Sequence, residues 1–179
     1  MLIRAYHRGM TLIELMIGIV IVGLLLALAA PSYIAWLHNS QIRTAAESII
    51  NGIQLTRAEA VRRNVNVQFS LTDLPTSKWT VSVPSTAEVV QTRFGGEGSA
   101  TASVATTPIG PPAATTVTFT GLGRVAATNA DASAPLTRAD ISSTVTSTST
   151  RSLRILVNGG VVRMCDSALP ATDPQSCSF

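Results

Sequence analysis

Near its start the chain carries an almost unbroken run of apolar residues, the strongest feature of its hydrophobic pattern. Within residues 10–30, Thr11 and Glu14 are the clearly polar positions. As a helix, this run would extend roughly 31 Å, which matches a bilayer hydrocarbon thickness of about 30 Å. The pattern therefore predicts a transmembrane helix, which we assign to residues 10–33.

After this run the apolar residues recur with the spacing of an amphipathic helix. The recurring positions, three, four or seven residues apart, are Ile42, Ala46, Ile49, Ile53 and Ala60. One helix face should therefore be buried in a folded domain. Glu59 and Arg63 form an i,i+4 pair in the favourable order, and the residues from Asn64 onward favour an end near Arg63. We assign residues 34–64 to this continuation of the helix.

From Val65 onward the pattern alternates between apolar and polar residues, which is typical of strands. The expected strands are 65–69, 78–83, 116–120 and 153–157. The stretches 95–114 and 126–150 are rich in small and polar residues and are expected to be long surface loops. Residues 65–179 should thus form one domain of antiparallel sheet over the helix, and the predicted fold class is α+β.

A short basic segment precedes the apolar run. Arg4, His7 and Arg8 lie on its N-terminal side, so the positive-inside rule predicts a cytoplasmic N-terminus and export of the C-terminal domain. A secretory signal is cut after its apolar stretch, whereas a cut after Gly9 would leave that stretch on the mature protein. Residues 1–9 are therefore predicted to be a cleavable leader, with Met10 as the new N-terminus.

Two residues of the apolar run need an explanation. A carboxylate at Glu14 costs at least ~2.5 kcal/mol in a membrane helix unless it is paired or reaches water. The new amine of Met10, in the same or a neighbouring chain, would compensate it, and so would the nearby lipid headgroups. Pro31 removes one backbone donor and crowds the preceding turn, so the helix should bend or melt locally there.

The segment from Gly9 to Glu14, the apolar helix and Pro31 resemble the N-terminus of type IV pilins and type II secretion pseudopilins. In that superfamily a prepilin peptidase cuts after the glycine and N-methylates the next residue, which would be Met10. The resemblance implies that Glu14 aligns each incoming subunit with its neighbour and that Pro31 is the kink proline. Residues 57–64 look like the end of this helix in the GspH/FimT branch.

The chain has two cysteines, Cys165 and Cys177. An exported domain lies in an oxidising compartment, where a bridge between them would close a loop of about 13 residues and contribute roughly 3 kcal/mol. Two free thiols are the alternative. A zinc site is less favoured, because two cysteines twelve residues apart without a nearby histidine leave it incomplete.

The C-terminal tail resembles that of FimT and FimU minor pilins, and FimT-like members bind DNA through a Gly-Arg-x-Arg motif. The comparable positions here are Gly160, Val161, Val162 and Arg163. Val161 replaces the first arginine, so one of the two phosphate-seeking groups is missing. Arg151, Arg154 and Arg163 would still form a phosphate-binding patch if adjacent strands bring them together, or each would simply be solvated.

Charge and histidine content argue against other function classes. The formal charge is +3, and removal of the two leader arginines leaves +1, which indicates no nucleic-acid partner by itself. His7 leaves with the leader and His38 lies near the membrane, so the domain lacks a histidine for a triad or a metal site. Turn chemistry explains Asp173 better than a pair with Asp166. We expect no catalysis, no cofactor and no metal.

Together these features predict an inner-membrane, pilin-like subunit with a periplasmic C-terminal domain. It would assemble through its N-terminal helix into a type IV pilus tip or a type II secretion pseudopilus. The expected partners are prepilin peptidase, other pilins or pseudopilins and inner-membrane lipid. The alternative function is DNA uptake in natural transformation, with double-stranded DNA as a further partner.

Overall fold

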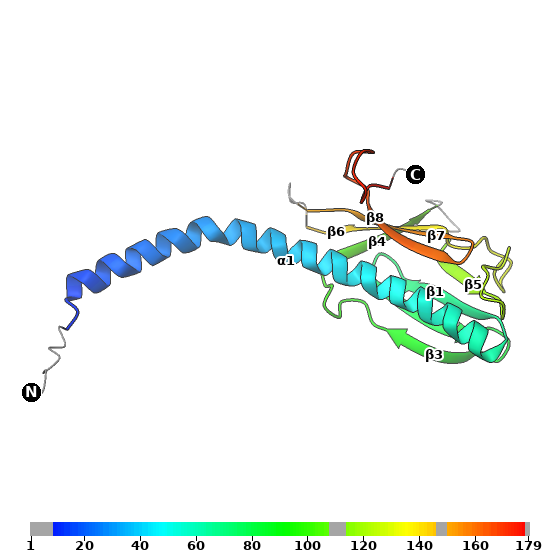
Figure 1. Ribbon diagram of the computed structural model, residues 1–179. Coiled ribbons are helices and arrows are strands. Elements are labelled where there is room, and N and C mark those ends of the chain that lie inside the picture. The colour runs from blue at the N-terminus through cyan, green and yellow to red at the C-terminus, as the bar shows by residue number, and fades with distance from the viewer. Residues whose placement is uncertain (1–8, 108–113, 146–149, 178–179) are drawn as a thin grey trace, which may run out of the picture. The chain divides into compact units, whose positions relative to one another are not determined.

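A computed structural model of the protein describes residues 9–107, 114–145 and 150–177 (Figure 1). The chain divides into two compact units, Met1–Trp36 and Leu37–Phe179. The predicted leader arginines and His7 lie outside the described residues. Helix α1, Leu12–Arg63, contributes its first part to the first unit and its remainder to the second.

The first unit consists of the apolar part of α1. Among the described residues, α1 is the one helix long and apolar enough to cross a membrane, with a mean hydropathy of 2.8 over its most apolar 18 residues. All residues from 9 to 34 are exposed in the isolated chain. Pro31 lies inside the helix, which continues unbroken. Local melting at Pro31, one of the two expected outcomes, is therefore wrong, because the flanking turns remain helical around the missing donor; a bend stays a prediction.

The second part of α1 buries the face that the periodicity predicts. Ile42, Ala46, Ile49, Ile53 and Ala60 are all fully buried. The helix then ends at Arg63 because Asn64 takes a left-handed conformation, with φ of 54°. The N–H groups of Asn64 and Val65 donate to the carbonyls of Val61 and Ala60, which is the Schellman arrangement.

The chain after this helix forms two antiparallel four-stranded sheets (Figure 1). Sheet A has the order β3-β2-β1-β5, with β1 Val67–Asp73, β2 Lys78–Val83, β3 Glu88–Arg93 and β5 Thr116–Phe119. Sheet B has the order β4-β6-β7-β8, with β4 Ala102–Thr107, β6 Arg138–Ser143, β7 Leu153–Asn158 and β8 Val161–Asp166. The fold class is α+β, as predicted.

The helix packs closely against sheet A at Gly52. A Cβ atom there would lie 2.8 Å from Cε2 of Phe69 and 3.0 Å from Cε2 of Trp79. The two rings are tilted against each other with centroids 5.8 Å apart. The absence of a side chain at Gly52 therefore lets the helix reach the aromatic part of the core.

The structure corrects the expectation of two long surface loops. The stretch 95–114 contains β4, and the stretch 126–150 contains β6. Three of their large apolar residues are nevertheless buried, with Val104 at 2%, Leu136 at 1% and Ile141 at 0% exposure, whereas Val145 is 41% exposed. A strand that is covered on one face needs an apolar group only at alternate positions, and alanines fill several of these. Residues 108–113 and 146–149 lie outside the described part.

Candidate functional site

The start of α1 carries the residues predicted for processing and assembly. Gly9 and Met10 are exposed, and Thr11 precedes the first helical residue. The backbone N–H of Glu14 donates to Oγ1 of Thr11 over 3.2 Å, so Thr11 is the N-cap of the helix. Glu14 occupies the third helical position, where a carboxylate is favoured by the helix dipole.

This cap was not recognised in the sequence, although Thr11 and Glu14 have the Thr-x-x-Glu spacing of a capping box. The cap holds the backbone N–H of Glu14 and places its carboxylate at the positive end of the helix dipole. Pairing of its carboxylate with the Met10 amine stays a prediction.

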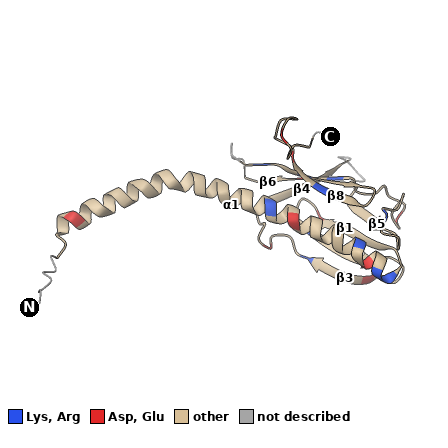
Figure 2. Cartoon of the chain, viewed as in Figure 1, with Lys and Arg blue, Asp and Glu red and all other residues tan. Residues whose placement is uncertain are grey.

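A shallow apolar groove of about 440 Å³ runs along the same helix beside Glu14. Its lining residues are Met10, Glu14, Leu15, Gly18, Ile19, Val22, Gly23 and Leu26. No atom lies within 4 Å of a Cβ built at Gly18 or at Gly23. Small residues on a membrane helix allow another helix to approach closely. This first part of α1 is uncharged along most of its length (Figure 2).

The C-terminal tail is closed by the predicted disulfide between Cys165 and Cys177. Cys165 lies at the end of β8 and is 4% exposed. Each of the two aspartates of this region accepts a local backbone hydrogen bond. Asp166 accepts from the N–H of Ala168 over 2.9 Å, and Asp173 from that of Gln175 over 2.8 Å. Turn chemistry at Asp173 is thereby confirmed.

Two of the three predicted DNA-contact arginines share one face of sheet B. Arg154 pairs with Cys165 across β7 and β8, and Arg163 pairs with Leu156. Because side chains alternate along a strand, Arg154 and Arg163 project from the same face. Arg151 precedes β7, where its backbone N–H donates to Oδ1 of Asn39 over 2.8 Å, so it lies outside this strand register.

An acidic residue on the neighbouring strand reduces the positive charge of this face. Asp140 of β6 bonds to Arg154 at 2.6 Å and to Arg138 at 2.7 Å. Neither Asp140 nor Arg138 was considered in the sequence, because β6 lay in a stretch expected to be a loop. One carboxylate therefore accompanies three guanidiniums on this face, counting Arg163.

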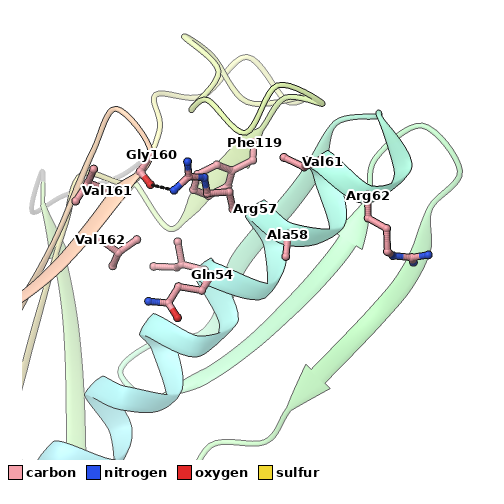
Figure 3. Close-up of a pocket in the computed structure, with 10 residues that line it drawn as sticks. Gln54, Arg57, Ala58, Val61, Arg62, Phe119, Gly160, Val161 and Val162 are labelled. Carbon is pink, nitrogen blue, oxygen red and sulfur yellow. Dashed lines mark hydrogen bonds between the residues drawn. The ribbon is translucent and has the colours of Figure 1, made fainter.

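A second groove, of about 710 Å³, lies between the last turns of α1 and β8 (Figure 3). Its lining residues are Ile53, Gln54, Arg57, Ala58, Val61, Arg62, Phe119, Gly160, Val161 and Val162. Arg57 points across it, and its Nη1 donates to the carbonyl oxygen of Gly160 over 3.0 Å. The lining is mostly apolar and contains no acidic residue, and Arg57 makes its rim basic, whereas the charge of Arg62 is compensated by Glu59.

The end of α1 beside this groove holds a compact ion-pair network. Glu59 accepts hydrogen bonds from Arg62 at 2.6 Å and from Arg63 at 2.7 Å, and Arg63 also bonds to Glu88 of β3 at 2.9 Å. The hydrogen bond from Arg62, followed by that from Arg63, lowers the pKa of Glu59 to about 2. The pair Glu59 and Arg63 is therefore confirmed.

His38 lies in the second unit, where its Nδ1 is 3.1 Å from Oγ1 of Thr101. Within the parts of the chain that the structure describes, no three side chains of His, Cys, Asp or Glu are grouped so that they could hold a metal ion. That the protein uses no metal or cofactor stays a prediction.

Comparison with known proteins found a short N-terminal motif and two similar solved structures. Residues 4–30 match the family model described as the prokaryotic N-terminal methylation motif. Two solved structures of the type IV minor pilin FimU from Pseudomonas aeruginosa strain PAO1 are similar to the chain. One is 18% identical and covers 76% of this chain and 94% of its own, with a TM-score of 0.49. The other is 17% identical and covers 75% and 98%, with a TM-score of 0.47.

No curated protein sequence matched the chain. A second family model, described as type II transport protein GspH, matches residues 45–160. This match includes the last part of α1, all of sheet A and three strands of sheet B, and it covers well over half of the sequence. The chain therefore belongs to the GspH family of pilin-like structural proteins.

Proposed function

We propose that this protein is a minor subunit of a type IV pilus or of a type II secretion pseudopilus, assembled through its N-terminal helix. The observation that carries the proposal is the apolar first part of α1, which is exposed from Leu12 to residue 34 and has a groove beside Glu14. A surface of this kind is stable in lipid or against other helices, and the subunit would move from the first to the second on assembly.

Processing by prepilin peptidase would come first. The methylation motif over residues 4–30 supports cleavage after Gly9 and N-methylation of Met10. The exposed position of both residues is compatible with access by an enzyme. Before assembly, the helix over residues 10–33 would anchor the subunit in the inner membrane, with the leader in the cytoplasm and the second unit in the periplasm. A disulfide in the second unit fits an oxidising compartment.

Glu14 would then act in assembly by pairing with the amine of Met10 in the same or a neighbouring subunit. Glu14→Ala should be cleaved normally but fail to enter filaments, because the amine would lose its partner in an apolar surrounding. Glu47→Ala is the matched control, since Glu47 lies on the same helix in an exposed pair with Arg43. Normal filament incorporation of Glu14→Ala would refute this role.

The destination of the subunit can be tested in a deletion strain, by measuring surface pili together with secreted proteins in the medium. Lost pili with normal secretion would support the minor pilin. Retained pili with secreted proteins trapped in the periplasm would support the pseudopilin. Normal pili with normal secretion would overturn the proposed function.

DNA binding is the second candidate, and the shared face of Arg154 and Arg163 is the observation that favours it. Asp140 offsets part of that charge. A salt titration of duplex DNA with the oxidised full chain in micelles would test it, because phosphate contacts weaken steeply with salt. Arg163→Gln should reduce binding at low salt, and no retention of DNA even at low salt would exclude this function.

A further inference from the structure

Strand β8 lies at the edge of sheet B, and its backbone groups point alternately toward β7 and away from it. Asn158 and Val161 flank the two-residue turn of the hairpin, so Val161 bonds to β7. The backbone N–H and C=O groups of the even-numbered residues of β8 therefore point away from β7. Two hydrogen bonds agree with this alternation. The carbonyl of Gly160 accepts from Arg57, and the N–H of Asp166 donates to the carbonyl of Gln175 over 2.8 Å.

These two hydrogen bonds occupy the ends of the edge and leave its middle open. The outward N–H and C=O groups of Val162 and Met164 have no hydrogen-bond partner among the described residues. An exposed strand edge of this kind is a template for another strand, and proteins usually protect it. In β8 only the two ends of the edge, at Gly160 and Asp166, are protected by hydrogen bonds from other residues.

The groove of about 710 Å³ lies beside this open stretch, with Val161 and Val162 on one wall and α1 on the other (Figure 3). Val161 is 59% exposed and Met164 is 38% exposed. An apolar side chain of an added strand would therefore find apolar surface. Arg57 on the rim has no acidic neighbour in the lining, whereas Arg62 is paired with Glu59, so Arg57 suits a segment that also carries a carboxylate.

We propose that the β8 edge binds an extended, acidic and apolar segment of a neighbouring filament subunit, which adds as a further strand beside Val162 and Met164. The length of the open edge limits the paired part to about four residues, since adjacent outward positions are two residues apart. Main-chain hydrogen bonds would give affinity, and the groove with Arg57 would select the side chains. Only the assignment of the partner to a filament rests on the proposed function.

A peptide of alternating valine and glutamate, with blocked ends, is a suitable probe of this site. It would be added to the full, oxidised chain in detergent micelles, and amide hydrogen exchange would be followed by NMR. The amides of Val162 and Met164 should exchange at least tenfold more slowly with the peptide. Those of Val161 and Arg163 should not change, because they already donate to β7.

Two control peptides separate charge from backbone pairing. Replacement of glutamate by lysine should abolish the protection, because the rim is basic. Replacement of the central valine by proline should do the same, because it removes a donor. Equal binding of the proline peptide, or binding without protection of Val162 and Met164, would overturn the inference.

Variants of the chain provide a second test. Met164→Pro removes an outward N–H without removing a bond to β7 and should abolish binding, whereas Met164→Ala should retain protection at residue 162. If Met164→Pro fails to fold, Arg57→Gln remains decisive. It keeps a donor for Gly160 but loses the charge, and it should weaken binding of the acidic peptide at least tenfold. Unchanged affinity of Arg57→Gln would refute the role of the basic rim.

The remaining outcomes separate this inference from the proposed function. Protection that rises with protein concentration in the absence of peptide would identify a second copy of the chain as the occupant and overturn the proposed partner. Absence of peptide binding, together with loss of pili or secretion in the deletion strain, would overturn the strand addition alone. Peptide binding with normal pili and secretion would overturn the filament partner.

Discussion

The indole Nε1 of Trp79 donates a hydrogen bond to Oγ of Ser48 over 2.9 Å, which joins sheet A to α1 inside the core. Ser48 is 3% exposed and Trp79 is 3% exposed. Ser48→Ala leaves the indole N–H buried without an acceptor, so we expect a loss of about 1–3 kcal/mol in unfolding free energy. Near-UV circular dichroism during urea denaturation would measure it. Ser40→Ala, on an exposed position of the same helix, should change little, and equal effects would contradict the prediction.

Gly52→Ala should also destabilise the second unit. Alanine favours a helix over glycine by up to about 1 kcal/mol, but the new methyl group would lie 2.8 Å from the Phe69 ring. Overpacking of this kind costs about 1–3 kcal/mol and should outweigh the gain. Gly18→Ala, which meets no atom within 4 Å in the isolated chain, is the control for helix propensity. A more stable Gly52→Ala protein in thermal unfolding would show that the rings can move aside.

Removal of the tail disulfide should lower the unfolding free energy by about 3 kcal/mol, since Cys165 and Cys177 are twelve positions apart. The double substitution Cys165→Ser and Cys177→Ser would show this in denaturant titrations. A reducing agent should lower the stability of the unmodified chain and leave that of the double variant unchanged. Equal stability of the two oxidised proteins would contradict the estimate.

Acid should weaken the end of α1 in a defined range of pH. Hydrogen bonds from Arg62 and Arg63 lower the pKa of Glu59 from 4.5 to about 2, so the folded state binds a proton there less readily than the unfolded state. The stabilisation is therefore complete above about pH 4.5 and is lost as the pH falls toward about 2. Glu59→Gln should flatten this part of the stability profile. Glu47→Gln, in an exposed pair, should not, and an unchanged slope in Glu59→Gln would contradict the assignment.

The helix was the most predictable element of the fold. Its periodicity identified the buried face from Ile42 to Ala60, and the left-handed Asn64 marks the end that the sequence predicted near Arg63. Periodicity is reliable there because a long helix repeats the same signal over many turns. The strand at 78–83 was also predicted with its observed bounds, since six alternating residues end at clear turns.

Short strands without large side chains escaped prediction. β4 has Val104 as its one large apolar residue, and alanine, serine and threonine fill its other positions. β6 has Ile141 as its one large apolar residue, and its other positions hold alanine, serine, Arg138 and Asp140. Pairing with neighbouring strands decides their conformation, and such tertiary contacts are not visible in a local pattern. Arg138 and Asp140 were missed for the same reason.

Interactions between residues close in sequence were predicted better than those between distant residues. The pairing of Cys165 with Cys177 followed from compartment and spacing, and turn chemistry at Asp173 followed from the adjacent proline. Which arginines share a face depended on the register of β7 with β8, which the sequence does not determine. The groove beside Arg57 likewise depends on residues about 100 positions apart.

The covalent closure of the tail has a consequence for producing this protein. Gln175 and Ser176 cover Asp166 at the end of β8, and the bond from Cys165 to Cys177 holds them there. In a reducing compartment the tail would be released. A longer part of the β8 edge would then be unpaired, and it would promote aggregation between newly made chains. Overexpression in the cytoplasm should therefore yield insoluble material, whereas oxidative refolding or export should recover it.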